Sequence, residues 1–144
     1  MRLTRFTDFG LRALMRMASE PERAYSTAEI AGEFGISRNH LTKTIAALAA
    51  AGIVETRRGT GGGAVLARPP AKLRLGDIVG VLEQKSAMVE CFSTDGGACV
   101  ITPTCRLKGI LSGARSRFLN DLNAYTLADC ALPPKPERRN GDVR

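Results

Sequence analysis

The chain has 144 residues, a formal net charge of +7 and a sequence pI near 9.7. This length suits one domain with its own core, and the positive charge favours an anionic partner, first nucleic acid and second a membrane surface. Charged residues interrupt the first twenty positions, and no run approaches the roughly 18 apolar residues of a membrane helix. We therefore expect a leaderless cytoplasmic protein without a membrane span.

Two helices are predicted in the first 35 residues. Apolar residues recur at helical spacing over residues 4–19, where Gly10 indicates close packing and Asp8 lies in the first turn, which favours a carboxylate. A second helix is expected to begin at Ser26, the first residue of the capping-box sequence Ser-Thr-Ala-Glu. It is expected to end at Gly35, which accepts the left-handed conformation common after helices.

The third predicted helix, Ser37 to Ala51, follows the second after a short turn, as is typical of a helix-turn-helix. Its apolar residues are spaced to face a core, and the opposite side is polar. The candidate DNA-contacting side chains on that side are Arg38, Asn39, His40, Thr42 and Lys43. Such side chains contact base edges and phosphates. We interpret the helix as a recognition helix, with an ordinary solvated face as the alternative.

A β-hairpin with a basic, glycine-rich tip is predicted for residues 53–68. Its glycines allow the positive φ angles of a tight turn. The pattern G-x-x-x-x-G-K-[ST] is absent, which argues against a nucleotide phosphate loop. Directly after a helix-turn-helix, the hairpin is better interpreted as a wing. Its Arg57 and Arg58 are expected to lie on DNA phosphates or in a minor groove.

Three cysteines, Cys91, Cys99 and Cys105, lie in one stretch after a helix predicted over residues 75–85. The stretch is rich in Gly, Ser, Thr and Pro and is predicted to be a loop. Clustered thiolates suit an iron–sulfur cluster, zinc or copper(I), and the absence of a C-x2-C pair disfavours structural zinc. In a cytosolic chain the thiols are expected to be reduced.

The helix predicted after this loop carries an apolar stripe with an a/d-like spacing. The stripe consists of Leu107, Leu111, Ala114, Phe118 and Leu122. Such a seam is typical of a dimerisation helix, and packing onto its own domain is the alternative. The last residues are rich in proline and charge and are expected to be disordered.

The predicted fold is mainly α. A winged helix-turn-helix DNA-binding domain is assigned to residues 1–85, and a cysteine-rich cluster loop to 86–106. A dimerisation helix with a C-terminal packing segment is assigned to 107–130, and a disordered tail to 131–144. One histidine and no nucleophile–base pair argue against an enzyme.

Nearly all of residues 1–130 resembles a known family. The matching segments are LTRFTDFGLRAL (3–14), SRNHLTK (37–43), the GGG of the hairpin, CVITPTCRLK (99–108) and LNAYTLAD (122–129). With these segments the chain resembles the winged-helix iron–sulfur regulators that include IscR and NsrR. The resemblance is strongest to the nitric-oxide-sensing repressors of the NsrR type.

The resemblance implies a homodimer with one cluster per subunit, held by the three cysteines and by Asp8 from the other subunit. A 4Fe-4S cluster is favoured and a 2Fe-2S cluster is possible. The family resemblance further implies a repressor that binds a near-palindromic operator in double-stranded DNA and releases it when nitric oxide attacks the cluster.

Three positions depart from the family pattern. The gap from Cys91 to Cys99 is longer than usual, Lys108 stands where IscR-like members have histidine, and Cys130 stands where an apolar residue is expected. We expect Cys130 to be a packed or surface thiol. Lys108 disfavours a regulator of iron–sulfur assembly. That regulator and a thiol- or zinc-switched repressor without a cluster remain the alternatives.

Overall fold

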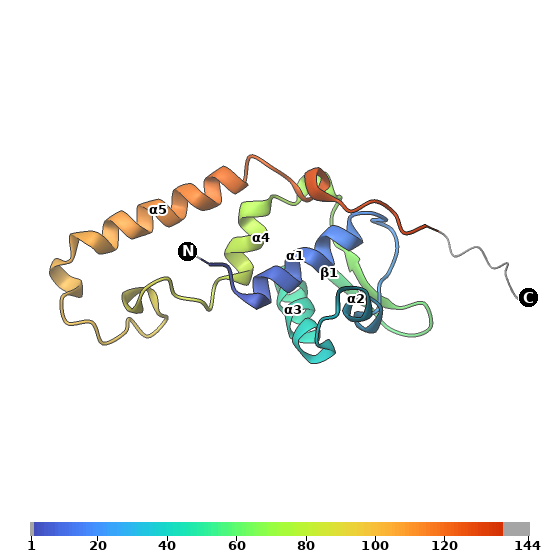
Figure 1. Ribbon diagram of the computed structural model, residues 1–144, viewed down its shortest axis with the longest axis horizontal. Coiled ribbons are helices and arrows are strands. Elements are labelled where there is room, and N and C mark those ends of the chain that lie inside the picture. The colour runs from blue at the N-terminus through green and yellow to red at the C-terminus, as the bar shows by residue number, and fades with distance from the viewer. Residues whose placement is uncertain (1, 137–144) are drawn as a thin grey trace, which may run out of the picture.

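The computed structural model describes residues 2–136, in which five α-helices accompany one two-stranded antiparallel sheet (Figure 1). The α-helices are α1 (Arg5–Met17), α2 (Thr27–Phe34), α3 (Arg38–Ala50), α4 (Leu75–Leu82) and α5 (Arg106–Leu122). The strands are β1 (Val54–Arg57) and β2 (Gly63–Leu66). The short 3-10 helices are η1 (Pro70–Lys72), η2 (Glu90–Phe92), η3 (Thr102–Thr104) and η4 (Leu127–Cys130). The predicted winged helix-turn-helix fold is confirmed.

Capping residues set the bounds of α2 and α3 as the sequence predicted. The Ser26 hydroxyl accepts a hydrogen bond from the backbone N–H of Glu29 at 3.0 Å, and Gly35 ends α2 with a φ of 62°. In a complete capping box the Glu29 carboxylate would accept a hydrogen bond from the Ser26 N–H. Here it pairs with Arg23 at 2.6 Å, and the cap consists of the Ser26 hydroxyl. Ser37 then caps α3. The two helices thus form the helix-turn-helix.

The core lies between α1, α2, α3, α4 and the base of the wing. Ala13 and Leu14 of α1 are fully buried and so are Leu41 and Leu48 of α3, which places α1 at the centre of the module. The wing joins this core at Tyr25, which forms a β-bridge with Ala64 of β2. The apolar spacing that predicted α1, α2, α3 and α4 therefore faces one shared core.

The helix α5 lies along α4 and extends away from the rest of the domain (Figure 1). The two helices pack closely at Gly76, because a Cβ there would overlap the backbone oxygen of Leu119. Although it has 17 residues, α5 has none that is buried. Long loops on either side of η2 and η3 join α4 to α5 and contain the three clustered cysteines.

After α5 the chain returns to the helix-turn-helix. Leu127 of η4 is fully buried in the core, and residues 131–136 then run along α1 and α2. The tail was predicted to be disordered from residue 131, and its residues 137–144 lie outside the part that the structure describes. Among residues 2–136, no helix combines the length and the apolar character that crossing a bilayer requires.

Candidate functional site

The recognition helix exposes the polar side that the sequence predicted. Leu41, Thr44, Ile45 and Leu48 are buried beneath it. All the predicted DNA-contacting residues of this helix are exposed, namely Arg38, Asn39, His40, Thr42 and Lys43. They form a polar surface with two permanent positive charges, which suits contact with base edges and phosphates.

Two of these side chains are already held in place. The His40 ring stacks on Phe9 of α1, with ring centroids 6.5 Å apart and an interplanar angle of 24°. The Thr42 hydroxyl donates a hydrogen bond to the backbone oxygen of Arg38 at 2.8 Å, so its oxygen is left as an acceptor toward solvent. The stack of Phe9 on His40 links α1 directly to the start of the recognition helix.

The wing holds its two arginines in solvent. Arg57 ends β1 and pairs with Gly63 of β2, and Arg58 follows in the turn. Both are exposed, and neither forms an ion pair with another described residue. Gly63 has a φ of 144°, and a Cβ there would overlap the backbone of Tyr25, so this position requires glycine. The wing therefore offers free positive charge next to the recognition helix.

The cysteine loop carries three half-buried free thiols. Cys91 lies in η2, and Cys105 lies directly before α5. The Glu90 carboxylate accepts a hydrogen bond from the Ala98 N–H at 2.9 Å, which joins the chain segments next to Cys91 and Cys99. Within residues 2–136, no group of three or more His, Cys, Asp or Glu side chains is gathered closely enough to hold a metal. The donor set, three thiols on one Gly-rich loop, nevertheless fits an iron–sulfur cluster chemically.

Cys130 lies apart from this loop. It packs against the hydrophobic core, and its thiol donates to the backbone oxygen of Leu127 at 3.5 Å. Burial, together with the nearby charge of Asp129, raises the pKa of the Cys130 thiol. A thiol that is harder to ionise is a poorer metal ligand and a poorer nucleophile.

Asp8 lies in the first turn of α1, as predicted. Its carboxylate accepts two hydrogen bonds from Arg12 of the same helix, at 2.8 and 3.1 Å. Both side chains are 46% exposed. The pair therefore lies within reach of another molecule, for which Asp8 keeps unused acceptor sites beside its bonds to Arg12.

Glu83, directly after α4, is a site residue that sequence reasoning missed. Its carboxylate accepts hydrogen bonds from the Thr4 N–H at 2.8 Å, from the Thr4 hydroxyl at 2.9 Å and from the Thr7 hydroxyl. Burial opposes its ionisation, but these hydrogen bonds outweigh burial and lower the pKa of the Glu83 carboxyl. Glu83 thus fixes the start of α1 to the residue at which the cysteine loop leaves α4. No local pattern marks this contact, because Thr4 is 79 residues away.

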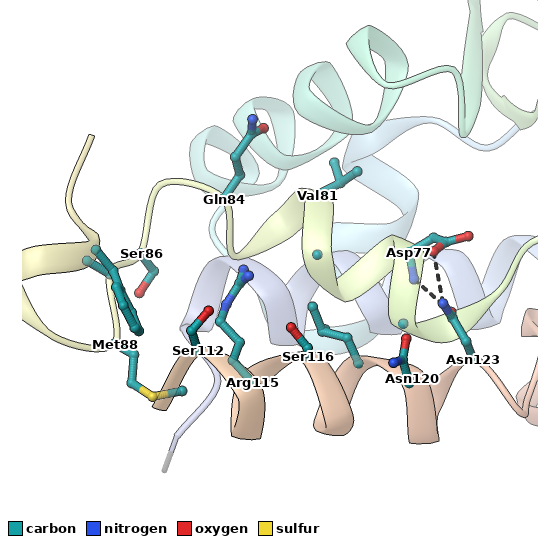
Figure 2. Close-up of a pocket in the computed structure, with 15 residues that line it drawn as sticks. Asp77, Val81, Gln84, Ser86, Met88, Ser112, Arg115, Ser116, Asn120 and Asn123 are labelled. Carbon is teal, nitrogen blue, oxygen red and sulfur yellow. Dashed lines mark hydrogen bonds between the residues drawn. The ribbon is translucent and has the colours of Figure 1, made fainter. Parts of the chain in front are cut away.

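The two flanks of α5 differ in chemistry. A polar cavity of about 780 Å³ opens between α4 and α5, and Figure 2 shows Arg115, Ser112 and Asn120 among its walls. A second cavity, of about 570 Å³, lies beside Leu111 and Phe118 of the predicted seam, and its walls are mainly apolar. Near the start of the helix, Leu107 and Ile110 are 57% and 62% exposed. The apolar flank is the one that suits contact with a second copy.

Comparisons with known proteins agree with this architecture. The model of the Rrf2 family, described as iron-dependent transcriptional regulators, matches residues 3–132. The structure of IscR from T. potens has a TM-score of 0.67 and 28% sequence identity, and the match covers 90% of this chain and 85% of that one. CymR (YrzC), the global cysteine regulator of B. subtilis, has a TM-score of 0.68 and 27% identity, covering 91% and 96% of the two chains.

A third structure supports the fold alone. The oxidized form of Staphylococcus aureus CymR has a TM-score of 0.68 at 22% identity, and the match covers 94% of this chain and 100% of that one. Since the family model spans the recognition helix, the wing, the cysteine loop and α5, the chain belongs to the Rrf2 family of transcriptional regulators.

Proposed function

We propose that this protein is a transcriptional repressor whose DNA binding is controlled by an iron–sulfur cluster that senses nitric oxide. The observation that carries this proposal is the set of free thiols of Cys91, Cys99 and Cys105 on the loop that joins α4 to α5. Thiolates of this kind hold iron–sulfur clusters, with 4Fe-4S favoured here and 2Fe-2S possible. The Lys108 side chain after the third cysteine favours this function over regulation of cluster assembly.

The proposed fourth ligand is Asp8 from the second copy of a homodimer. Family members bind DNA and form homodimers, and the exposed apolar flank of α5 is the surface that we assign to the dimer. The Asp8 carboxylate is accessible, and among residues 2–136 its side-chain partner is Arg12. As a ligand it would tie the start of α1 to the partner's loop.

In this proposal the chain couples its cysteine loop to DNA through α1. When bound, an iron–sulfur cluster supplies iron atoms with which nitric oxide reacts. The loop leaves α4 at Glu83, whose carboxylate holds Thr4 and Thr7 of the neighbouring helix. Phe9, two residues further along α1, stacks on His40 of the recognition helix. A change in the loop is therefore expected to alter the placement of the recognition helix, a two-state coupling of the allosteric kind.

The visible absorption spectrum of protein purified without oxygen tests the cofactor, together with assays of iron and sulfide. We expect a cluster spectrum and about one cluster per subunit. Gel-shift titration with operator DNA before and after nitric oxide then tests the sensor. Operator affinity is expected to fall by roughly 5–150-fold, while sedimentation still finds the dimer. Unchanged affinity after complete nitrosylation would refute the sensor, and release of monomers would refute control within an intact dimer.

A thiol-switched repressor without a cluster is the second candidate. It is favoured by one observation: the three thiols are free and are not gathered into a metal-holding group within the described residues. In that case anaerobic protein would contain neither iron nor sulfide. Mild oxidation would instead join two of the loop thiols and change operator affinity. The iron and sulfide assays therefore separate the two candidates before any DNA measurement.

A further inference from the structure

The segment of residues 131–136, here called the C-terminal strap, is held against α1 by two hydrogen bonds, one of them between backbone groups. The Leu132 N–H donates to the backbone oxygen of Met15 at 3.0 Å. The Arg16 guanidinium donates to the backbone oxygen of Pro133 at 2.8 Å. Leu132 and Pro133 of the strap therefore lie against the end of α1.

An ion-pair network joins the strap to α2. Arg16 Nη2 and Nε donate to Glu33 Oε1 at 2.6 and 2.9 Å, and Nε also reaches Glu33 Oε2 at 3.1 Å. Lys135 Nζ lies 2.7 Å from the same Oε2. The Arg16 and Glu33 side chains are only 9% and 18% exposed. Burial opposes the ionisation of Glu33, but the hydrogen bonds from Lys135 and Arg16 outweigh it, and the pKa of the Glu33 carboxyl is lowered. One carboxylate thus connects α1, α2 and the strap.

The chain just before the strap, residues 126–127, is anchored as well. The Leu127 N–H donates to the backbone oxygen of Leu73 at 2.8 Å, and Thr126 forms a β-bridge with Arg74 before α4. Leu127 itself is fully buried. The segment from Thr126 to Lys135, which includes the strap, therefore runs from an anchored point after α5 to an ion pair on α2. The predicted dimerisation helix is thus linked to the helix-turn-helix by a second route, separate from the cysteine loop.

We propose that Glu33 is a positioning residue for DNA binding, and that the strap, through the network of Arg16, Glu33 and Lys135, holds α2 in the orientation that operator DNA requires. The helix α2 has only eight residues, and it packs more on the recognition helix α3 than on α1. A tilt of α2 therefore displaces α3. This inference rests on the DNA binding of the family and does not depend on the cluster or on its signal.

The variant Glu33→Gln in the full-length protein tests the proposal, because two explanations predict opposite signs. Removing a negative charge strengthens general attraction to DNA. A positioning role instead predicts a loss of about fivefold or more in operator affinity, with binding to random DNA not weakened. Glu22→Gln is the matched control, since Glu22 is exposed and forms no ion pair with a described residue. Operator affinity that rises for both variants would overturn the proposal.

A milder pair of variants covers the case in which Glu33→Gln folds poorly. Lys135→Met leaves the buried pair of Arg16 and Glu33 intact, and Lys135→Arg keeps the cation. We expect Lys135→Met to lower operator affinity more than the control Lys72→Met, which removes the same charge from an exposed side chain. Lys135→Arg is expected to keep operator affinity near that of the wild type. Amide exchange in α2, followed without DNA, is expected to quicken only in Lys135→Met. Equal affinities for the two Met variants with unchanged exchange in α2 would refute the positioning role.

Discussion

The Leu82 side chain of α4 fills the space beside Gly10 of α1, where an added Cβ would lie 2.8 Å from Leu82 Cδ1. The same added atom would lie 3.0 Å from Thr44 Cγ2 on α3. Three helices therefore meet at one glycine. One of them leads into the cysteine loop and another is the recognition helix. We expect a displacement of α4 to shift α3 through the contacts at this junction.

The junction predicts opposite effects for two glycine-to-alanine substitutions. Gly10→Ala should destabilise the protein by about 1 kcal/mol, because overpacking costs about 1–3 kcal/mol and the gain in helix propensity is only about 1 kcal/mol. Gly32→Ala in α2 has nothing within 4 Å of its new atom and should stabilise by up to about 1 kcal/mol. Urea denaturation measures both, and equal effects would contradict the close contact at Gly10.

The thiols of the cysteine loop should be individually necessary for the cluster. Replacing Cys91, Cys99 or Cys105 with Ala is expected to abolish iron and sulfide retention, since three thiolates leave no spare donor. Cys130→Ala is the matched control, because that thiol packs against the core outside the loop. Anaerobic absorption spectra of the four variants decide the assignment. Loss of colour in Cys130→Ala together with its retention in Cys99→Ala would be incompatible with it.

Two measurements on one variant distinguish the two possible roles of Asp8, cluster ligand and helix-dipole residue. As a ligand from the other subunit, Asp8→Ala should change the cluster spectrum and the reaction with nitric oxide, with little effect on the metal-free protein. As a helix-dipole residue paired with Arg12, its loss should instead lower metal-free stability by about 0.3–1 kcal/mol and leave the cluster unchanged. Spectra of loaded protein and thermal unfolding of metal-free protein distinguish the two.

The wing and the recognition helix should differ in what they contribute to DNA binding. Substituting Arg57 or Arg58 is expected to weaken binding to all sequences and to reduce the salt slope by about 1 per lost phosphate contact. Substituting Arg38 or Asn39 should instead relax base preference, by about 1–3 kcal/mol per lost bidentate contact. Titrations on operator and random DNA at several salt concentrations test this division. The division would be refuted if the wing variants and the recognition-helix variants lost the same affinity on both DNAs.

Glu83 should make folding stability depend on pH. Its carboxyl has a folded-state pKa below the ordinary value of 4.5, because hydrogen bonds from Thr7 and Thr4 outweigh burial. A lowered carboxyl pKa gives stability that is fully present above the unfolded value and is lost as pH falls through the folded one. Glu83→Gln should therefore be less stable than wild type at pH 7, with a difference that shrinks below about pH 4.5. Urea denaturation at pH 7 and pH 4 checks this, and a difference independent of pH would argue against it.

Much of the fold was predictable because it is encoded over a few residues. Ser26, Gly35 and Ser37 mark helix ends through short-range hydrogen bonds and backbone conformation, and the structure confirms all three. The low propensity of Gly10 predicted close packing in α1, which the contact with Leu82 confirms. The exposed side of the recognition helix followed from helical periodicity. The ligand roles of the cysteines and of Asp8 stay predictions.

The sequence by itself determined the helices, the wing and the presence of three cysteines in one loop, because each is a pattern of residues that lie close together in the chain. Only the tertiary structure decided which carboxylates connect these parts. Glu83 meets Thr4 across 79 residues, and Arg16 donates to Pro133 across 117. Such contacts follow from how helices pack, and their physical value comes from partial burial, which weakens solvation of the charges and strengthens their hydrogen bonds. No local pattern carries that information.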